Sequence, residues 1–458
     1  MSSSISTLDF YIYITTMNLN TIASLLSQTC QLNTEITDIC TDSRLLKPGN
    51  LFVAIQGENF DGHDFVKNAE TQGAIAVIVN RPVAGLTIPQ FVVPDPLLAL
   101  AKIAAAHRQN MHCPVIALTG SNGKTTVKEM IAAILPQPSH ATKGNLNNHI
   151  GAPLSVLGLT SQHRYAVFEL GANHLGEIAH TVAVVHPDVT LINNIAPAHV
   201  EGFGSIDGVA KAKGEIHQGL SSTGMAVVND DDAYAHFWDD LLLDKKTLRF
   251  SAQHQADVYA QDVRLDIHGR GQFSLVLPNG RADIELQVPG LHNVRNALAA
   301  AACCYAVGIN IKDIQQGLNH FSGVKGRMTV LTGKNNATII DDTYNANLRS
   351  VLSALEVLAS RPGKKIFVFG GMAELGDWAD QHHTEVGIAA GQLGIDQLIT
   401  CGTMSELSSK AFGLAGHHCA SKEDVVKIVL NELTPDTTVL VKGSRSSAME
   451  KIVHKLLN

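Results

Sequence analysis

The chain has 458 residues and a mass of 48.9 kDa, and its 34 basic and 42 acidic side chains give a formal net charge of −8. At roughly 150 residues per domain, this length predicts about three domains. An apolar fraction of 45% with only 17% charged residues is typical of globular domains with buried cores and excludes a mainly disordered chain. The mildly acidic pI of about 6.2 argues against a nucleic acid as the main partner, which would require a basic face.

The cysteine pattern and the N-terminal sequence indicate the cellular compartment of the protein. The seven cysteines include no C-x-x-C pair, so we expect neither a disulfide framework nor a structural zinc site, as in a reducing compartment. No apolar run reaches the ~18–20 residues of a membrane-spanning helix. Residues 1–16 lack the basic start and cleavage site of a signal peptide, and we interpret them as a short extension before Met17. We expect a cytoplasmic protein without membrane insertion, and a monomer.

Apolar runs divide the chain into three predicted domains. In the first, short apolar runs predict strands, and Pro96 can start a helix over 96–109. In the second, strands alternate with helical patterns, which indicates a parallel sheet covered on both faces. The predicted strands are 51–55 and 74–80 in the first domain and 115–120, 165–170 and 188–195 in the second. The predicted boundaries are 1–110, 111–321 and 322–458.

Two further patterns complete the fold prediction. Residues 257–289 alternate with a period of two between turn signals, which predicts antiparallel strands at the edge of the central sheet. A helix over 293–308 follows. The last domain alternates strands and helices again, which predicts a second, Rossmann-like doubly wound sheet with strands at 337–341, 365–370, 397–402 and 438–443. The predicted fold class is therefore α/β with three domains.

A glycine-rich loop gives the sharpest local signal. The string TGSNGKTT (119–126) lies between a strand and a helix, where backbone N–H groups and the helix N-terminus can face phosphate oxygens. Lys124 can reach the β- and γ-phosphates, and the Thr125 hydroxyl can ligate Mg²⁺. Leu118 stands where the usual first glycine of such loops would be. An ordinary tight turn is the alternative, but a lysine followed by two threonines favours a shortened phosphate loop. Its predicted nucleotide-binding residues are Gly120, Ser121, Asn122, Gly123, Lys124, Thr125 and Thr126.

Two polar residues stand at the ends of predicted strands of the second domain. Glu169 ends one strand and His199 follows another, so both reach the carboxyl edge of the parallel sheet. A strand-end glutamate alone is usually solvated, and a loop histidine alone is usually only polar. Together with the phosphate loop they predict a divalent-metal site. The segment 208–220 predicts a helix carrying Lys211 and Lys213, and spacing alone favours a solvated face for these lysines.

These motifs together resemble the Mur ligases, the ATP-dependent amino-acid ligases of peptidoglycan synthesis. The resemblance extends from Met17 onward and includes the phosphate loop, Glu169, His199 and the AKAKGE helix. The segment 41–65 resembles the uridine-nucleotide-binding domain of that family. The strings IIDDTYNAN, FGGMAELGD and VLVKGSRSSAME resemble the branch that joins D-alanyl-D-alanine to UDP-N-acetylmuramoyl-tripeptide. The Asp-Asn-Pro-Arg motif typical of the diaminopimelate-adding branch does not occur in the sequence.

The resemblance implies ATP and two Mg²⁺ ions, with Lys124, Lys213, Arg327 and His199 as catalytic residues. Lys213 falls where several members carry a carbamylated lysine, which offers a hard metal an anionic oxygen. Leu348 departs from the family, which often has proline there, and this should alter a helix start rather than the chemistry. The implied contacts are Thr125, Glu169, His199 and Lys213 on metal; Asn293 and Asn296 on adenine; Arg327 on the γ-phosphate; Asp342 on ribose; Ser43 and Arg44 on the uridine nucleotide; and Asn147 and Asn148 on the muramoyl peptide.

The implied reaction phosphorylates the terminal carboxylate of the tripeptide, after which the dipeptide amine attacks the acyl phosphate. Because Arg327 and Asp342 lie beyond the linker, ATP should bridge the second and third domains, and the last domain should close during turnover.

Several of these site residues also have a purely structural interpretation. An asparagine early in a helix is commonly a cap, and an arginine in a Gly-rich linker is commonly solvated. Three other functions also stay open: a folylpolyglutamate synthase, a non-catalytic nucleotide-binding protein, and a simple P-loop phosphotransferase. Diaminopimelate and lysine both remain open as the third residue of the tripeptide.

Overall fold

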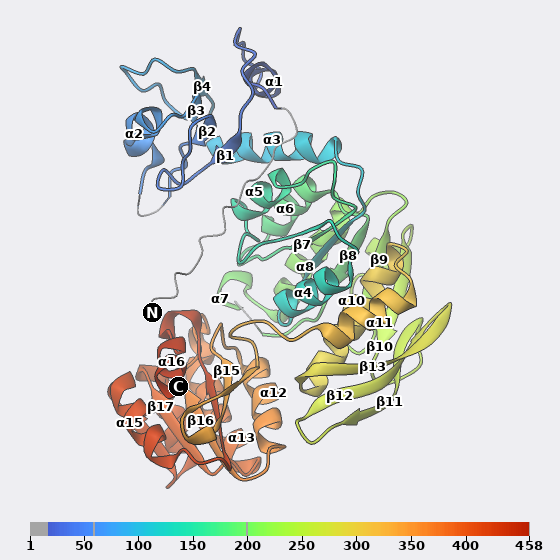
Figure 1. The fold of residues 1–458 in the computed structure, drawn as a ribbon, viewed down its shortest axis with the longest axis vertical. Helices are drawn as coiled ribbons and strands as arrows, with labels where there is room; N and C mark the ends of the chain where they lie inside the picture. The colour runs from blue at the N-terminus through green and yellow to red at the C-terminus, as the bar shows by residue number, and fades with distance from the viewer. Residues whose placement is uncertain (1–16, 58–59, 198–199, 458) are drawn as a thin grey trace. The chain divides into compact units, whose positions relative to one another are not determined.

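The computed structural model describes residues 17–57, 60–197 and 200–457 (Figure 1). The chain forms two compact units, which we describe separately. The first comprises Met1–Ala117, Pro136–Gly171 and Glu177–Pro187, and the second comprises Leu118–Leu135, Ala172–Gly176 and Asp188–Asn458. The predicted boundaries after residues 110 and 321 stay predictions.

The first unit begins with a small parallel sheet of four strands in the order β1-β2-β3-β4. Alternate residues such as Phe52 and Val77 pack into a core beneath α2, because successive side chains of a strand point to opposite faces. The helix α3 starts at Pro96 as predicted, and Asp95 caps it by accepting from two backbone N–H groups. The elements are α1 (Leu19–Leu25), β1 (Asp38–Cys40), β2 (Asn50–Val53), α2 (Val66–Thr71), β3 (Ala76–Val79), β4 (Gln90–Val92) and α3 (Pro96–Gln109).

The rest of the first unit places Glu169 at a strand end. Strand β6 (Ser139–Ala141) pairs in parallel with β7 (Tyr165–Glu169). The Ala166 N–H of β7 donates to the Pro114 carbonyl, immediately before β5 (Val115–Thr119). The unit also holds the helices α5 (Gly151–Leu157) and α6 (Glu177–Val185).

The second unit contains the phosphate loop and the antiparallel strands. Strands β8 to β11 lie side by side in parallel, and β12 and β13 continue antiparallel, which confirms the predicted edge. The helix α10 packs across these strands (Figure 1). The elements are α4 (Lys124–Ile134), β8 (Val189–Ile192), α7 (Val200–Phe203), α8 (Ile206–Gly214), β9 (Met225–Asn229), α9 (Asp239–Leu242), β10 (Lys246–Ser251), β11 (Val258–Leu265), β12 (Arg270–Leu277), β13 (Gly280–Pro289), α10 (Leu291–Ala306) and α11 (Ile311–His320).

The C-terminal part is a six-stranded, doubly wound sheet in the order β14-β15-β19-β16-β17-β18. Ile340 points into a core with α12 and α13, whereas its neighbour Ile339 points into a core with α15 and α16, so helices cover both faces. The elements are β14 (Thr329–Thr332), β15 (Thr338–Asp342), α12 (Leu348–Ala359), β16 (Lys364–Phe369), α13 (Ala379–Gln392), β17 (Gln397–Cys401), α14 (Glu406–Phe412), β18 (Gly416–Cys419), α15 (Lys422–Glu432), β19 (Thr437–Lys442) and α16 (Glu450–Leu456).

The fold class is α/β with three domains, as predicted, and its centre is a predominantly parallel sheet. The edge strands β14 and β18 were not predicted from the sequence. The strand β18 reads Gly-His-His-Cys, which lacks an apolar run, and β14 is antiparallel and only partly buried. Among the described residues, no helix is long and apolar enough to cross a membrane.

Candidate nucleotide-binding site

The phosphate loop turns tightly from β5 into α4. Gly123 caps α4 with a left-handed φ of 78°, which side chains rarely adopt. A Cβ on Gly123 would lie 2.5 Å from Asn296 Oδ1 and 2.6 Å from Asn193 Nδ2. The position therefore favours glycine, and the backbone N–H groups at the start of a helix can face an anion.

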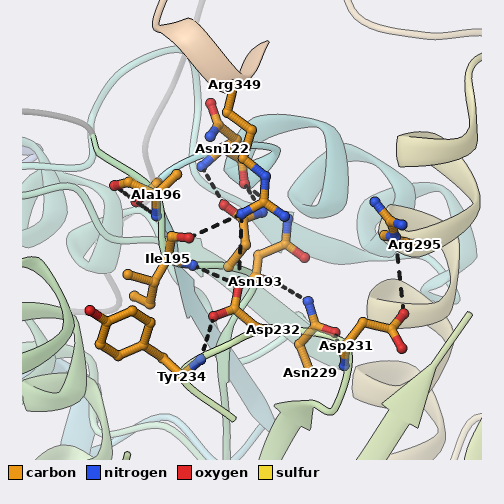
Figure 2. Close-up of polar contacts among 12 residues, drawn as sticks. Asn122, Asn193, Ile195, Ala196, Asn229, Asp231, Asp232, Tyr234, Arg295 and Arg349 are labelled. Carbon is orange, nitrogen blue, oxygen red and sulfur yellow. Dashed lines mark hydrogen bonds and ion pairs between the residues drawn. The ribbon is translucent and has the colours of Figure 1, made fainter. Parts of the chain in front are cut away.

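A network of asparagine side chains supports this loop (Figure 2). Asn193 Nδ2 donates to the Asn122 carbonyl at 2.9 Å and to Asn296 Oδ1 at 3.1 Å. Asn194 contacts the backbone of the same residue twice: its Nδ2 donates to the Asn122 carbonyl, and its Oδ1 accepts from the Asn122 N–H. Asn229 Nδ2 in turn donates to the Asn193 carbonyl at 2.8 Å. We call these five residues, together with Asn293, the amide network.

Ser121 fixes the loop to the segment that follows β8. Its hydroxyl donates to the Ala196 carbonyl at 3.0 Å and accepts from the Ala196 N–H at 2.9 Å. The Ser121 N–H also donates to the Asn194 carbonyl. Residues 193–196 therefore act as a backbone splint for the loop.

Two cations of the predicted site lie at the loop. Lys124 Nζ donates to the Gly120 carbonyl at 2.8 Å. Arg327 donates to the Thr125 hydroxyl at 2.9 Å, and its guanidinium stacks 4.2 Å from the Tyr344 ring. Among the described residues, the buried Arg327 Nε has no hydrogen-bond partner. The alternative of a solvated linker arginine is therefore wrong, and the orphaned donor fits an arginine that meets an anionic ligand.

Glu169 is buried rather than solvated, with 2% of its surface exposed. Its Oε1 accepts from Asn147 Nδ2 at 2.9 Å, and its N–H donates to the Thr142 hydroxyl. Its Oε2 has no partner among the described residues, so it can serve as a hard oxygen donor for Mg²⁺. His199 lies outside the described residues. In the part of the chain that the structure describes, no three His, Cys, Asp or Glu side chains form a metal cluster.

Lys213 differs sharply from Lys211 on the same helix. Lys211 is exposed, whereas only 2% of Lys213 is exposed. Burial lowers the pKa of Lys213 well below its usual range, and the positive charge of Lys124 lowers it further. Its ammonium position lies 5.8 Å from the centre of the Phe203 ring. The solvated alternative is wrong for Lys213, because its side chain is buried.

The residues predicted to lie near adenine and ribose form hydrogen bonds with other groups of the protein. Asn293 Nδ2 donates to the Pro289 carbonyl, and its Oδ1 accepts from Asn296 Nδ2, so neither side chain caps α10. Asp342 Oδ2 accepts from buried Lys442 Nζ at 2.6 Å. The Lys442 partner was missed from the sequence, although it lies in the string VLVKGSRSSAME.

The residues predicted to contact the uridine substrate lie in the first unit. Ser43 is buried, whereas the Arg44 side chain is 85% exposed and pairs with Asp42 at 2.6 Å. The Arg44 hydrogen bond lowers the pKa of Asp42. Asn148 Oδ1 accepts from the Gly151 N–H at 2.8 Å and thereby helps to start α5. Their substrate contacts stay predictions.

Three family models match most of the chain. The Mur ligase middle domain matches residues 118–304, the Mur ligase glutamate ligase domain matches 326–445, and the Mur ligase family catalytic domain matches 35–108. The chain belongs to the Mur ligase family. A curated UDP-N-acetylmuramoyl-tripeptide–D-alanyl-D-alanine ligase from Escherichia coli is 46% identical over 424 residues, which cover 91% of this chain and 93% of the relative.

Solved structures agree with this membership. The structure of MurF from Acinetobacter baumannii superposes with a TM-score of 0.91 at 35% identity, covering 97% of this Mur ligase and 99% of that chain. A MurF ligase from Thermotoga maritima in complex with ADP gives a TM-score of 0.80 at 27% identity, covering 92% and 96%. Both match over nearly their full length.

Several site residues of this Mur ligase were not found from its sequence. Asn193 and Asn194 hold the loop, yet the pair reads as a plain strand ending, and only its position at the carboxyl end of β8 carries a signal. Arg349, described below, lies two residues beyond the IIDDTYNAN string, and its partner Asp232 lies outside all of the motifs quoted above. Contacts between residues so far apart in the sequence depend on packing that no local pattern encodes.

Proposed function

We propose that this Mur ligase joins D-alanyl-D-alanine to UDP-N-acetylmuramoyl-tripeptide at the expense of ATP, giving UDP-N-acetylmuramoyl-pentapeptide, ADP and phosphate in peptidoglycan synthesis. Within the site, the main observation that supports this reaction is the hydrogen bond from Arg327, which lies beyond the linker, to the Thr125 hydroxyl of the phosphate loop. The substrates are supported by the curated relative of that name, which is similar from end to end. Nucleotide use is supported by the ADP complex of the Thermotoga maritima relative.

The chemistry requires an activated carboxylate, because a free carboxylate is a poor electrophile at neutral pH. A carboxylate oxygen of the tripeptide attacks the γ-phosphorus with release of ADP, and an acyl phosphate forms. The dipeptide nitrogen then attacks the acyl carbon, inorganic phosphate departs with the bridging oxygen, and the nitrogen loses its extra proton to solvent or a base. Lys124, Arg327 and the N–H groups at the start of α4 stabilise the negative charge gathered in both steps.

We extend the proposal to two Mg²⁺ ions, which when bound would neutralise phosphate charge and orient the carboxylate. Thr125, Glu169 and His199 are the proposed ligands, and the orphaned Glu169 Oε2 supports this assignment. Lys213 would contribute after carbamylation: its neutral nitrogen attacks the carbon of CO₂ and releases a proton to water. The buried position of Lys213 and its lowered pKa support that step.

Asn293 and Asn296 remain proposed for adenine, Asp342 for ribose, and Ser43, Arg44, Asn147 and Asn148 for the uridine substrate. We also propose a cytoplasmic monomer. All seven cysteines are free thiols, which supports a reducing compartment.

The test is phosphate release from ATP and Mg²⁺ with UDP-N-acetylmuramoyl-tripeptide, with and without D-alanyl-D-alanine. We expect release that depends on the dipeptide, and a product heavier by the dipeptide less water. Lys124→Ala should lower kcat by about 10²–10³-fold, as losses of preorganised charge stabilisation commonly do. Release that needs neither substrate would indicate a generic ATPase. No release with either the diaminopimelate or the lysine form would favour a non-catalytic nucleotide-binding protein.

A further inference from the structure

Arg349 connects the last domain to the backbone splint of the phosphate loop. It lies in the first turn of α12, and its Nη1 donates to the Ile195 carbonyl at 3.0 Å. The same nitrogen lies 3.9 Å from Asp232 Oδ2 (Figure 2). No motif of the family resemblance includes Arg349.

The backbone of Ile195 is held through both of its polar groups. Its N–H donates to Asp232 Oδ2 at 3.0 Å, while its carbonyl accepts from Arg349. The carboxylate of Asp232 is 6% exposed and also accepts from the Tyr234 N–H. Arg349 therefore supplies a positive charge to a buried carboxylate and a donor to a neighbouring carbonyl. Both contacts come from the same nitrogen, one as a hydrogen bond and the other as an ion pair.

The same turn of α12 also reaches the loop directly. Asn347, the N-cap of α12, donates through Nδ2 to Asn122 Oδ1 at 2.7 Å. The hydroxyl of the loop residue Ser121 forms two hydrogen bonds with the backbone of Ala196, which follows Ile195. The start of α12 thus touches both the phosphate loop and the splint behind it.

We propose that Arg349 is a positioning residue for the nucleotide: it locks residues 193–196, and through them the phosphate loop, when α12 lies against the splint. Nucleotide affinity and turnover then depend on a residue of the last domain that touches neither substrate. The structural argument rests on the contacts above, and only the kinetic test rests on the proposed function.

The first test measures the splint itself. Hydrogen exchange of the Ile195 and Ala196 amides should be about tenfold faster in Arg349→Ala than in the unmodified chain, with ADP present. Arg281→Ala is the matched control, because Arg281 is an exposed arginine near the start of β13. ADP affinity by calorimetry should fall about tenfold in Arg349→Ala and stay unchanged in the control. Unaltered exchange and unaltered ADP affinity would overturn the proposal, whatever the substrate proves to be.

The second test separates positioning from stability. In Arg349→Ala, kcat should fall and KM for ATP should rise, while KM for the uridine substrate and the midpoint of thermal unfolding stay constant. Arg349→Lys keeps the charge and one donor and should recover part of the loss. An equal rise in both KM values with a lower unfolding midpoint would indicate a merely structural role and overturn the assignment. If neither the unmodified chain nor its variants make product, the proposed function fails while the exchange result still stands.

Discussion

At the scale of single residues, burial decides what a charged group can do. Lys213 and Lys211 lie in the same helix, but of the two only Lys213 is buried. Its pKa is lowered because burial removes water from the ammonium group. Glu169 is likewise buried and keeps one oxygen without a partner among the described residues. Neither property is visible in a single letter of the sequence.

The Lys213 environment leads to a direct spectroscopic prediction. In the presence of ¹³C-bicarbonate, the chain should show one carbamate carbon signal that Lys213→Ala lacks, because the neutral amine adds CO₂. Lys211→Ala, which removes an exposed lysine from the same helix, should keep the signal. A spectrum without a carbamate signal, together with full activity of Lys213→Ala, would contradict the prediction.

Asp38 leads to a prediction on pH dependence. Burial raises the pKa of Asp38 to about 6, against the Ile39 N–H bond and the charge of Lys47, which lower it. The folded state then binds the proton more tightly than the unfolded state, so stability should fall as pH rises from about 4 to about 6 and level off above.

Asp38→Asn keeps the acceptor for Ile39 and should flatten this slope, measured by urea unfolding at pH 4, 5, 6 and 7. Asp64→Asn, at an exposed aspartate, is the control and should leave the slope as it is. Equal slopes in Asp38→Asn and the unmodified chain would remove Asp38 as the cause.

At the scale of elements, α12 meets the central sheet region at both ends. Its N-cap contacts the phosphate loop at Asn122, and beyond its last turn Arg361 is buried near Asp266 of the β11–β12 hairpin. In its last turn, Val357 packs so close to Gly290 that a Cβ added to Gly290 would lie 3.0 Å from the Val357 side chain. The predicted antiparallel edge therefore supplies a support for the last domain.

Asn347 has two roles that substitution can separate. It caps α12 by accepting from the Ser350 N–H, and its amide donates to Asn122. Asn347→Asp should retain the cap but lose the donor, so stability stays while ADP affinity falls. Asn347→Ala should lose both, with about 1 kcal/mol less stability. Chemical unfolding and calorimetry with ADP measure the two effects. Equal ADP affinity in all three proteins would show that the contact with Asn122 is irrelevant.

Elements with strong local patterns were predicted well. The α3 range and the strands β5, β7 and β16 match within a residue or two, because apolar runs and Pro96 encode them. Leu348, where the family often has proline, still begins α12, because Asn347 provides the cap. The amide network, Lys442 beside Asp342 and Arg349 beside Asp232 were not predictable. Each joins residues brought together only by the packed sheets.

At the scale of the whole molecule, the nucleotide site draws on distant parts of the chain. Arg327, Asn347 and Arg349 all lie beyond the second predicted domain, yet they contact the loop at residues 119–126 or its splint. Closing such a site around ligands excludes water and completes the charge set. The last domain should therefore respond to ligand binding.

Small-angle scattering tests this movement. The radius of gyration should decrease when a non-hydrolysable ATP analogue, Mg²⁺ and the uridine substrate are added together, because bound ligands should favour the arrangement in which Arg327, Asn347 and Arg349 contact the loop and its splint. The dipeptide alone should cause no change and serves as the control. Identical curves with and without the full set of ligands would count against closure.

The amide network has a consequence for the electrostatic field at the loop. A triphosphate brings several negative charges, and a scaffold of carboxylates would repel them and would change with protonation. Asn122, Asn193 and Asn296 hold the loop with groups that carry no net charge and do not titrate. These amide contacts therefore do not change with protonation, and the network itself neutralises none of the positive charge that meets the nucleotide.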